Sequence, residues 1–188
     1  MRFICGRRRP FGLNVGLVGV IALSLVLVPI GIGQHRDSGE QTVFRAMSAE
    51  AVLKIPAKDF ELKDLDGAQV RLSDFRGKQS VLLYFWASWC PSCISIKPQV
   101  AKLRTNVSRD RLEILAINVG AGDTLERLMQ FQKGHPTTYP VLYDDGGKVS
   151  RAYQVQGIPL FVLIDKEGAV VYRNNLLPGD IEKYLGSQ

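Results

Sequence analysis

Cysteine and histidine are both scarce in this sequence, and their scarcity limits the kinds of protein it can be. The 188 residues include three cysteines and two histidines. Small disulfide-stapled domains need a much denser set of cysteines, so an ordinary hydrophobic core must hold this chain together. Apolar residues make up 46% and charged residues 22% of the chain, which excludes an intrinsically disordered or collagen-like protein. The length fits one domain of ordinary size with a short extension.

The chain lacks a strong charge of either sign once its N-terminus is set aside. The formal charge is +6, but residues 1–33 contain four arginines and no acidic residue. The remaining residues hold 20 basic and 18 acidic side chains. Residues 34–188 are therefore close to neutral and lack the excess of basic residues that is typical of proteins that bind DNA or RNA. We therefore expect no nucleic-acid partner.

A long uncharged segment follows the N-terminal arginines. Residues 11–33 contain no charged side chain, and residues 15–32 are mostly Val, Ile, Leu and Gly. A membrane-spanning helix needs about 20 apolar residues, whereas a cleavable signal usually has an apolar region of about 7–15. The length favours a retained anchor, although the small residues at 31–33 leave cleavage open. The preceding arginines predict a cytoplasmic N-terminus, which places the rest of the chain across the membrane.

The sequence divides into three parts. Residues 1–33 are the N-terminal membrane anchor or uncleaved signal, residues 34–56 read as a polar tether, and residues 57–188 form the folded domain. In this domain apolar runs typical of strands alternate with helical segments, which predicts an α/β fold with a mixed sheet covered on both faces.

Asp66-Gly67 marks a hairpin turn near the start of the folded domain. We expect Asp123 to cap a helix over residues 124–133 and Pro98 to kink or end the first helix. The expected strands cover residues 60–64, 70–72, 80–86, 112–119, 139–143, 160–164 and 169–173, and the expected helices cover residues 91–107, 124–133, 147–153 and 179–185.

The chemistry of the sequence is concentrated in Cys90-Pro91-Ser92-Cys93, at the predicted junction of a buried strand and a helix. A thiol at a helix N-terminus faces unsatisfied backbone N–H groups and the positive end of the helix dipole, which favours the reactive thiolate. The spacing of the two cysteines lets the second sulfur resolve a mixed disulfide formed by the first. Pro91 fits the first helical turn, where no N–H is needed.

Other uses of the two thiols are weaker. A closed zinc site needs two further Cys or His ligands, and only His35 and His135 are candidates on the same side of the membrane. A copper chaperone could bind Cu(I) through the same thiolates, but methionine and histidine do not cluster around them. A purely structural disulfide would close a very short loop and stabilise little. A thiol peroxidase would need a lone peroxidatic cysteine with activating neighbours, which this motif does not match.

Several segments resemble the TlpA/ResA-like thiol–disulfide oxidoreductases, membrane-anchored bacterial members of the thioredoxin superfamily. The active-site motif is the most specific of them, and the resemblance extends over residues 57–185. It implies a thioredoxin-like sandwich with a central mixed β-sheet flanked by helices, an N-terminal β-hairpin, and a central helix–strand insertion between residues 123 and 143. The matching segments are residues 57–62, 66–67, 72–78, 85–93, 139–144 and 157–165.

The resemblance also implies an activity and a location. Cys90 and Cys93 would be the catalytic pair, with Cys90 attacking and Cys93 resolving, and no cofactor or metal would be needed. The enzyme would reduce protein disulfides, in some relatives for cytochrome c maturation. Its partners would be protein disulfide or dithiol substrates, a membrane electron donor such as a DsbD/CcdA-like protein, and the lipid bilayer through residues 11–33. It would be a single-pass protein of the bacterial cytoplasmic membrane with its catalytic domain in the periplasm or outside the cell.

Four further residues are expected to contact the substrate. Trp89 flanks Cys90 and would shape docking together with Pro91. The resemblance implies a cis peptide bond before Pro159, stacked beside the cysteines, and a backbone at Ile158 that receives the substrate as an added strand. From the sequence alone, a proline at the first residue of a strand is permitted in any case, and a trans turn proline is the more common state of an X-Pro bond.

The chain departs from its relatives where they carry acidic residues. Thioredoxin has a buried aspartate six residues before its first active-site cysteine, and that position is Tyr84 here. The TlpA/ResA group usually has a glutamate three residues after the second cysteine, and that position is Ile96. Both candidate proton-relay carboxylates are therefore missing. The neighbouring Lys97 is expected to be a solvated helix charge, or alternatively to raise the positive potential around the thiolate.

Overall fold

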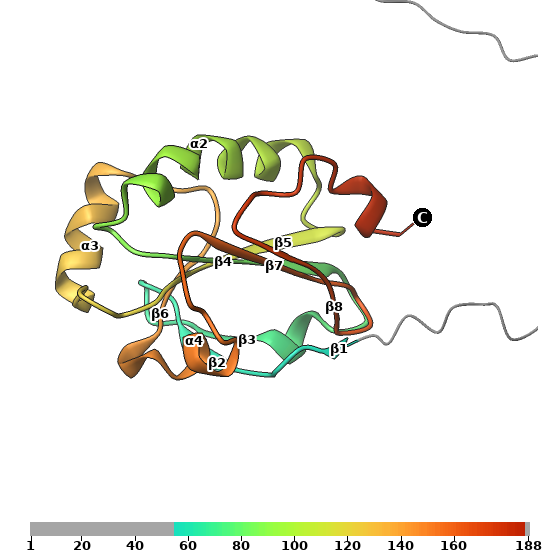
Figure 1. The fold of residues 1–188 in the computed structure, drawn as a ribbon, viewed down its shortest axis with the longest axis horizontal. Coiled ribbons are helices and arrows are strands. Elements are labelled where there is room, and N and C mark those ends of the chain that lie inside the picture. Colours follow the sequence, from blue (N-terminus) through green and yellow to red (C-terminus); the bar gives the residue numbers. More distant parts are fainter. Residues whose placement is uncertain (1–54, 187–188) are drawn as a thin grey trace, which may run out of the picture. The chain divides into compact units, whose positions relative to one another are not determined.

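A six-stranded mixed sheet forms the centre of the protein (Figure 1). The computed structural model describes residues 55–186, so the expected anchor and nearly all of the expected tether lie outside the described residues. The sheet confirms the α/β fold that the alternating pattern predicts. Its strand order is β1-β8-β7-β4-β5-β6. The strands are β1 (Ile55–Pro56), β4 (Ser80–Trp86), β5 (Leu112–Asn118), β6 (Val141–Tyr143), β7 (Leu160–Ile164) and β8 (Ala169–Asn174).

Strand β4 lies in the middle of the sheet and leads directly to the cysteines. It pairs in parallel with β5 and antiparallel with β7, and all seven of its residues are buried. Burial on both faces explains why its sequence is a continuous apolar run rather than an alternating one. Tyr84 and Trp86 pack together on one side of the sheet, whereas Phe85 packs against Tyr153.

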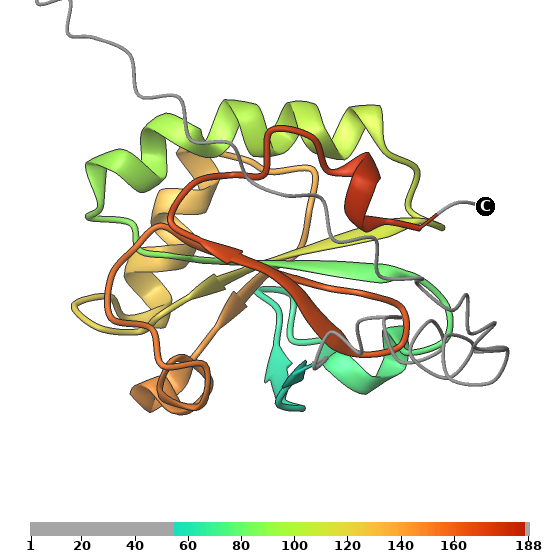
Figure 2. The same cartoon turned by 45° about the vertical axis from the view of Figure 1, so that its right-hand side comes forward.

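Helices cover both faces of the sheet (Figures 1 and 2). Helix α2 (Pro91–Asn106) lies along one face, and the short helix α4 (Lys148–Ala152) lies on the other. Helix α3 (Leu125–Gly134) and β6 form the expected insertion. The described residues also contain the 3₁₀ turns η1 (Leu72–Phe75), η2 (Asp145–Gly147) and η3 (Glu182–Tyr184). Within residues 55–186, none of the helices is both long enough and apolar enough to cross a bilayer.

The expected N-terminal hairpin is a separate two-stranded sheet. Strand β2 (Glu61–Lys63) pairs antiparallel with β3 (Gln69–Arg71). Gly67 adopts φ +88° in the connecting turn, a conformation that favours glycine. The Asp64 carboxylate accepts hydrogen bonds from the backbone of Ala68 and of the intervening residue 66, and so closes the turn.

Three local expectations differ from the structure. The last two residues assigned to the tether, Ile55 and Pro56, form β1 and pair with β8. Helix α2 does not end at Pro98, because residues beyond the proline, including Val100 and Arg104, are buried against the core. Tertiary packing therefore maintains the helix where local preference would break it. The segment 179–185 contains only the turn η3, and Ile181, just before this turn, is the single buried residue of the segment, so too little apolar surface is available to stabilise a longer helix.

Candidate active site

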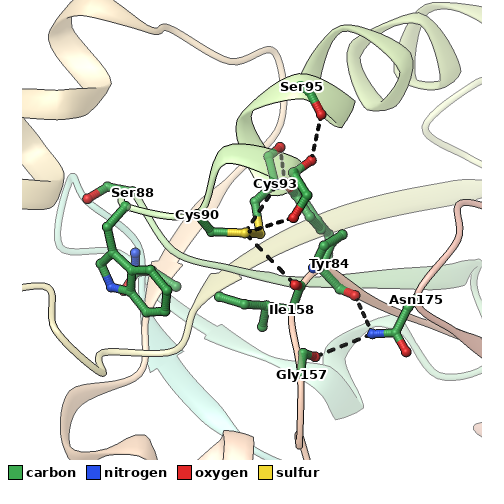
Figure 3. The surroundings of a disulfide bond; sticks show 12 residues. Tyr84, Ser88, Cys90, Cys93, Ser95, Gly157, Ile158 and Asn175 are labelled. Carbon is green, nitrogen blue, oxygen red and sulfur yellow. Dashed lines mark hydrogen bonds between the residues drawn. A yellow bond between two sulfur atoms is a disulfide. The ribbon is translucent and has the colours of Figure 1, made fainter.

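Cys90 and Cys93 form a disulfide at the N-terminus of α2 (Figure 3). Cys90 is the N-cap residue of this helix, and its Sγ accepts a hydrogen bond from the Cys93 backbone N–H at 3.2 Å. When the disulfide is reduced, the same N–H and the helix dipole favour a thiolate on Cys90. The structure thus provides, at the predicted junction of strand and helix, the local field that activates a nucleophilic sulfur.

The two sulfurs have different surroundings. Cys93 is completely buried, whereas Cys90 retains 4% of its surface. Cys90 Sγ lies 3.3 Å from the Ser92 hydroxyl and 3.9 Å from the carbonyl oxygen of Ile158 (Figure 3). A substrate sulfur can therefore approach Cys90 first, with Cys93 behind it.

The loop opposite the disulfide carries the residues expected to receive substrate. The peptide bond between Ile158 and Pro159 is cis, and this turn leads into β7. Asn175, just after β8, donates its side-chain amide to the Pro159 carbonyl at 2.6 Å and to the Gly157 carbonyl at 3.5 Å. The pairing of β7 with β8 brings Asn175 to this loop, so no local sequence signal reveals its role.

The loop before Cys90 is held by a buried carboxylate. Asp123 accepts hydrogen bonds from the Ser88 backbone N–H at 2.8 Å, from the Ser88 hydroxyl, and from the Asn118 side-chain amide at 2.7 Å. The expectation that Asp123 caps α3 is therefore wrong: the hydroxyl of Thr124 accepts from the Arg127 backbone and forms the cap. Asp123 instead accepts hydrogen bonds from Ser88, just after β4, and from Asn118, at the end of β5. These bonds hold the loop that leads to the cysteines in place.

Trp89 forms an exposed apolar surface beside Cys90. Its side chain remains 52% exposed, and its indole Nε1 donates to the Ala121 carbonyl at 2.7 Å. The ring lies against Gly122, where an added Cβ would come within 2.9 Å of Nε1. Pro91 is the first residue of α2 and is also exposed. These placements are compatible with the predicted docking role of both residues.

Tyr84 and Ile96 occupy the two positions at which the relatives carry carboxylates, and both side chains pack against the core. The Tyr84 hydroxyl donates to the Cys93 carbonyl at 2.7 Å, and burial raises the pKa of Tyr84 far above its usual value. Tyr84 therefore steadies the first turn of α2 but cannot accept a proton near neutral pH. Ile96 is half-buried and packs against the core.

Lys97 is not the solvated helix charge that its position suggested. Its Nζ is shielded from solvent and has no hydrogen-bond partner. It lies 4.6 Å from the ring centre of Trp86 and 4.9 Å from that of Phe131. Burial lowers the pKa of Lys97 to about 8. The aliphatic stem of Lys97 and its cation–π contacts with Trp86 and Phe131 hold the ammonium on the side of α2 that faces the sheet.

Among residues 55–186, no group of three or more His, Cys, Asp or Glu side chains is arranged to hold a metal ion. A disulfide at the N-terminus of a helix, following the central strand of this sheet and facing a cis-proline turn, defines a thioredoxin-like thiol–disulfide exchange site.

Comparison with known proteins identifies the family. Residues 54–173 match the AhpC/TSA family, and the chain belongs to that family. It is 38% identical over 133 residues to "Thiol-disulfide oxidoreductase ResA" of Geobacillus kaustophilus (strain HTA426), an alignment that covers 70% of this chain and 75% of the relative. The predicted relationship to the TlpA/ResA-like enzymes is confirmed, and the protein is a thiol–disulfide oxidoreductase.

Solved structures agree with this assignment. A putative thiol:disulfide interchange protein DsbE from Chlorobium tepidum superimposes with a TM-score of 0.61 at 32% identity, covering 70% of this chain and 91% of that one. A putative protein disulfide isomerase from Bacteroides thetaiotaomicron gives a TM-score of 0.57 at 34% identity, covering 64% and 77%. The thioredoxin-like fold expected from the sequence is therefore confirmed.

Proposed function

We propose that this enzyme reduces protein disulfides on the outer side of the cytoplasmic membrane, to which residues 11–33 tether it. The observation that carries the proposal is the pair of sulfurs at the start of α2, with Cys90 facing the backbone carbonyl of Ile158. An extended substrate segment could lie along the 157–159 turn and present its disulfide to Cys90. The resemblance to membrane-anchored reductases and the N-terminal uncharged segment support the direction and the location.

The reaction transfers two electrons from the cysteine pair to the substrate. The Cys90 thiolate attacks one substrate sulfur, which forms a mixed disulfide and releases the other substrate sulfur as a thiolate. Cys93 then loses its proton and attacks Cys90, which breaks the mixed disulfide and releases the second substrate thiolate. The enzyme is left as the observed Cys90–Cys93 disulfide.

The oxidised enzyme must be reduced again before the next cycle. Outside the cytoplasm no glutathione pool supplies electrons, so a membrane dithiol protein of the DsbD/CcdA type is the proposed donor. Cytochrome c maturation is a suitable destination for the electrons, because haem attachment uses a C-x-x-C-H segment with free cysteines. Both partners react by the same exchange chemistry at Cys90.

The equilibrium potential of the cysteine pair tests the proposed direction. We expect a value nearer to thioredoxin, about −270 mV, than to the strong oxidant DsbA, about −120 mV. The full-length chain with Cys5→Ser, equilibrated in glutathione or dithiothreitol buffers and alkylated, gives the value without interference from the third thiol. A potential near that of DsbA would contradict the reductase assignment and indicate an oxidase.

Alkaline carbonate extraction tests the proposed anchor. We expect the full-length chain to stay in the membrane pellet, because residues 11–33 carry no charge and are long enough to span the hydrocarbon core. A variant with two lysines introduced into residues 15–32 is the matched control and should be released. Release of the unmodified full-length chain into the wash would exclude a retained anchor.

A further inference from the structure

Lys97 places a buried, unpaired ammonium one helical turn beyond Cys93. Both residues lie on α2, four positions apart, so they share one face of the helix. Helical side chains lean back toward the N-terminus, which directs the lysine stem toward the turn that contains Cys93. The ammonium and the resolving sulfur therefore belong to the same region of the interior.

The rings beneath α2 link the two residues. Tyr84 and Trp86, two apart on β4, pack together with ring centres 6.2 Å apart. Tyr84 donates its hydroxyl to the carbonyl of Cys93, while the neighbouring Trp86 ring supports the ammonium of Lys97. Two adjacent rings of one strand thus contact the cysteine and the lysine.

No acidic group balances this ammonium in the described part of the chain. Its Nζ has neither a hydrogen-bond nor an ion-pair partner among residues 55–186. Titratable groups approach the same region from two other elements: His135 stacks on Phe131 of α3, and Tyr139 precedes β6. Both line, with Lys97, an apolar hollow beside α2. A neutral tyrosine and a histidine supply no negative charge, so the cation is unpaired while Cys90 and Cys93 are oxidised.

Burying an unpaired charge is costly, and proteins seldom retain one without a use for it. The missing counter-charge does arise during the reaction, because Cys93 must become a thiolate to attack the mixed disulfide. An opposite charge in the same poorly solvated region stabilises such an anion far more than it would in water. The two carboxylates that relatives carry near this sulfur are absent, which leaves the lysine as the charged group closest to it along the helix.

We propose that Lys97 is the electrostatic partner of Cys93 and stabilises its thiolate during resolution of the mixed disulfide. This role rests on the assignment of Cys93 as the resolving residue. The Cys93 proton leaves to solvent, the thiolate attacks the Cys90 sulfur, and the substrate thiolate departs. The ammonium keeps its proton throughout and contributes charge alone. The burial that lowers the pKa of Lys97 to about 8 sets an upper limit to this support, because an increasing fraction of the lysine is uncharged above that pH in the oxidised enzyme.

Two-phase thiol kinetics test the proposal. Full-length chain with Cys5→Ser is reduced and mixed with an equal amount of dithiobis(nitrobenzoate). The first thionitrobenzoate released reports attack by Cys90, and the second reports resolution by Cys93. We expect Lys97→Met to leave the first phase unchanged and to slow the second about tenfold at pH 7, with its pH profile shifted up by about one unit. Lys97→Arg should stay close to wild type, and Lys102→Met, which removes an exposed lysine from the same helix, should have no effect.

The outcomes separate the proposal from the activity itself. A second phase in Lys97→Met that superimposes on wild type across pH 6–9 would overturn the role of Lys97. Absence of both phases in the wild type would instead contradict the oxidoreductase assignment. Thermal unfolding of each variant verifies that it is folded. His135→Gln should leave the profile unchanged, which separates the lysine from the neighbouring imidazole.

A direct readout does not depend on turnover. In protein labelled with ¹³C at lysine Cε, the Lys97 signal, identified by its loss in Lys97→Met, should titrate near pH 8 in the oxidised enzyme. Reduction should raise this midpoint by about half a unit or more, because Cys93 ionises as the pH rises toward 9 and its thiolate favours the charged lysine. The increase should disappear in reduced Cys93→Ala. Equal midpoints in the oxidised and reduced wild type would show that the two groups do not interact, and would overturn the proposal even if Lys97→Arg does not fit the site.

Discussion

Replacement of Cys93 by serine is expected to convert the enzyme into a trap for its substrates. Cys90 is the sulfur with residual exposure and the one that accepts the Cys93 backbone N–H, so it performs the first attack. Serine at position 93 retains that N–H but provides no thiolate to break the mixed disulfide. The adduct should therefore accumulate to near completion, whereas wild type should hold almost none.

Non-reducing electrophoresis of cells that express each variant measures this difference. Cys90→Ser is the matched control and should trap nothing, because Cys93 is completely buried. Both variants carry Cys5→Ser, so that every adduct must involve the active site. Adducts that form in Cys90→Ser and not in Cys93→Ser would reverse the roles of the two cysteines.

The sequence predicts well those elements that are determined by residues close together in the chain. The strands at residues 80–86 and 160–164 are observed with the expected bounds, because short, continuous apolar runs are typical of strands that are buried on both faces of a sheet. The motif at Cys90–Cys93 also depends on local geometry: a strand that ends, a helix that begins, and two thiols within reach. Such features need no knowledge of distant contacts.

The functional features that could not be predicted depend on residues far apart in the sequence. Asp123 reads locally as a helix cap, yet it accepts from Ser88, which lies 35 positions earlier, because β5 runs beside β4. Asn175 reaches the 157–159 turn only because β8 folds back on β7. From the sequence, Lys97 is expected to be a solvated charge on a helix. In the structure the rings of Trp86 and Phe131 cover its ammonium. In each case a polar residue has a role that tertiary packing assigns.

Position 96 offers a way to restore the carboxylate that the chain lacks. Ile96 lies three residues after Cys93 on α2, within the next turn of the helix, and is half-buried against the core. A glutamate there would lie within reach of the resolving sulfur, directly or through one water. It would supply a base, which the apolar side chain of Ile96 cannot do. In our proposal the Lys97 cation of the wild type stabilises the thiolate but does not take up its proton.

We expect Ile96→Glu to accelerate resolution of a preformed Cys90 mixed disulfide by about 10²-fold below pH 7. The carboxylate must be ionised to accept the proton. Burial raises its pKa and the adjacent Lys97 ammonium lowers it, so the gain should fade toward pH 5. At pH 9 the profiles should converge, since the Cys93 thiol then ionises without help. Single-turnover release of thionitrobenzoate from pH 5 to 9 measures the effect.

Ile96→Gln is the matched control, because it has the same shape as the glutamate and a similar polarity but cannot accept a proton near neutral pH. Both variants place a polar group in a half-buried site, at a cost of about 1–3 kcal/mol in the free energy of unfolding. Thermal unfolding should therefore show similar losses for the two, while only the glutamate accelerates the second phase. Equal rates for Ile96→Glu, Ile96→Gln and wild type would show that proton removal from Cys93 does not limit resolution in this enzyme. The double variant Ile96→Glu with Lys97→Met then separates the two contributions: a base at 96 should still accelerate resolution after the ammonium is removed, because one group takes up the proton and the other stabilises the charge.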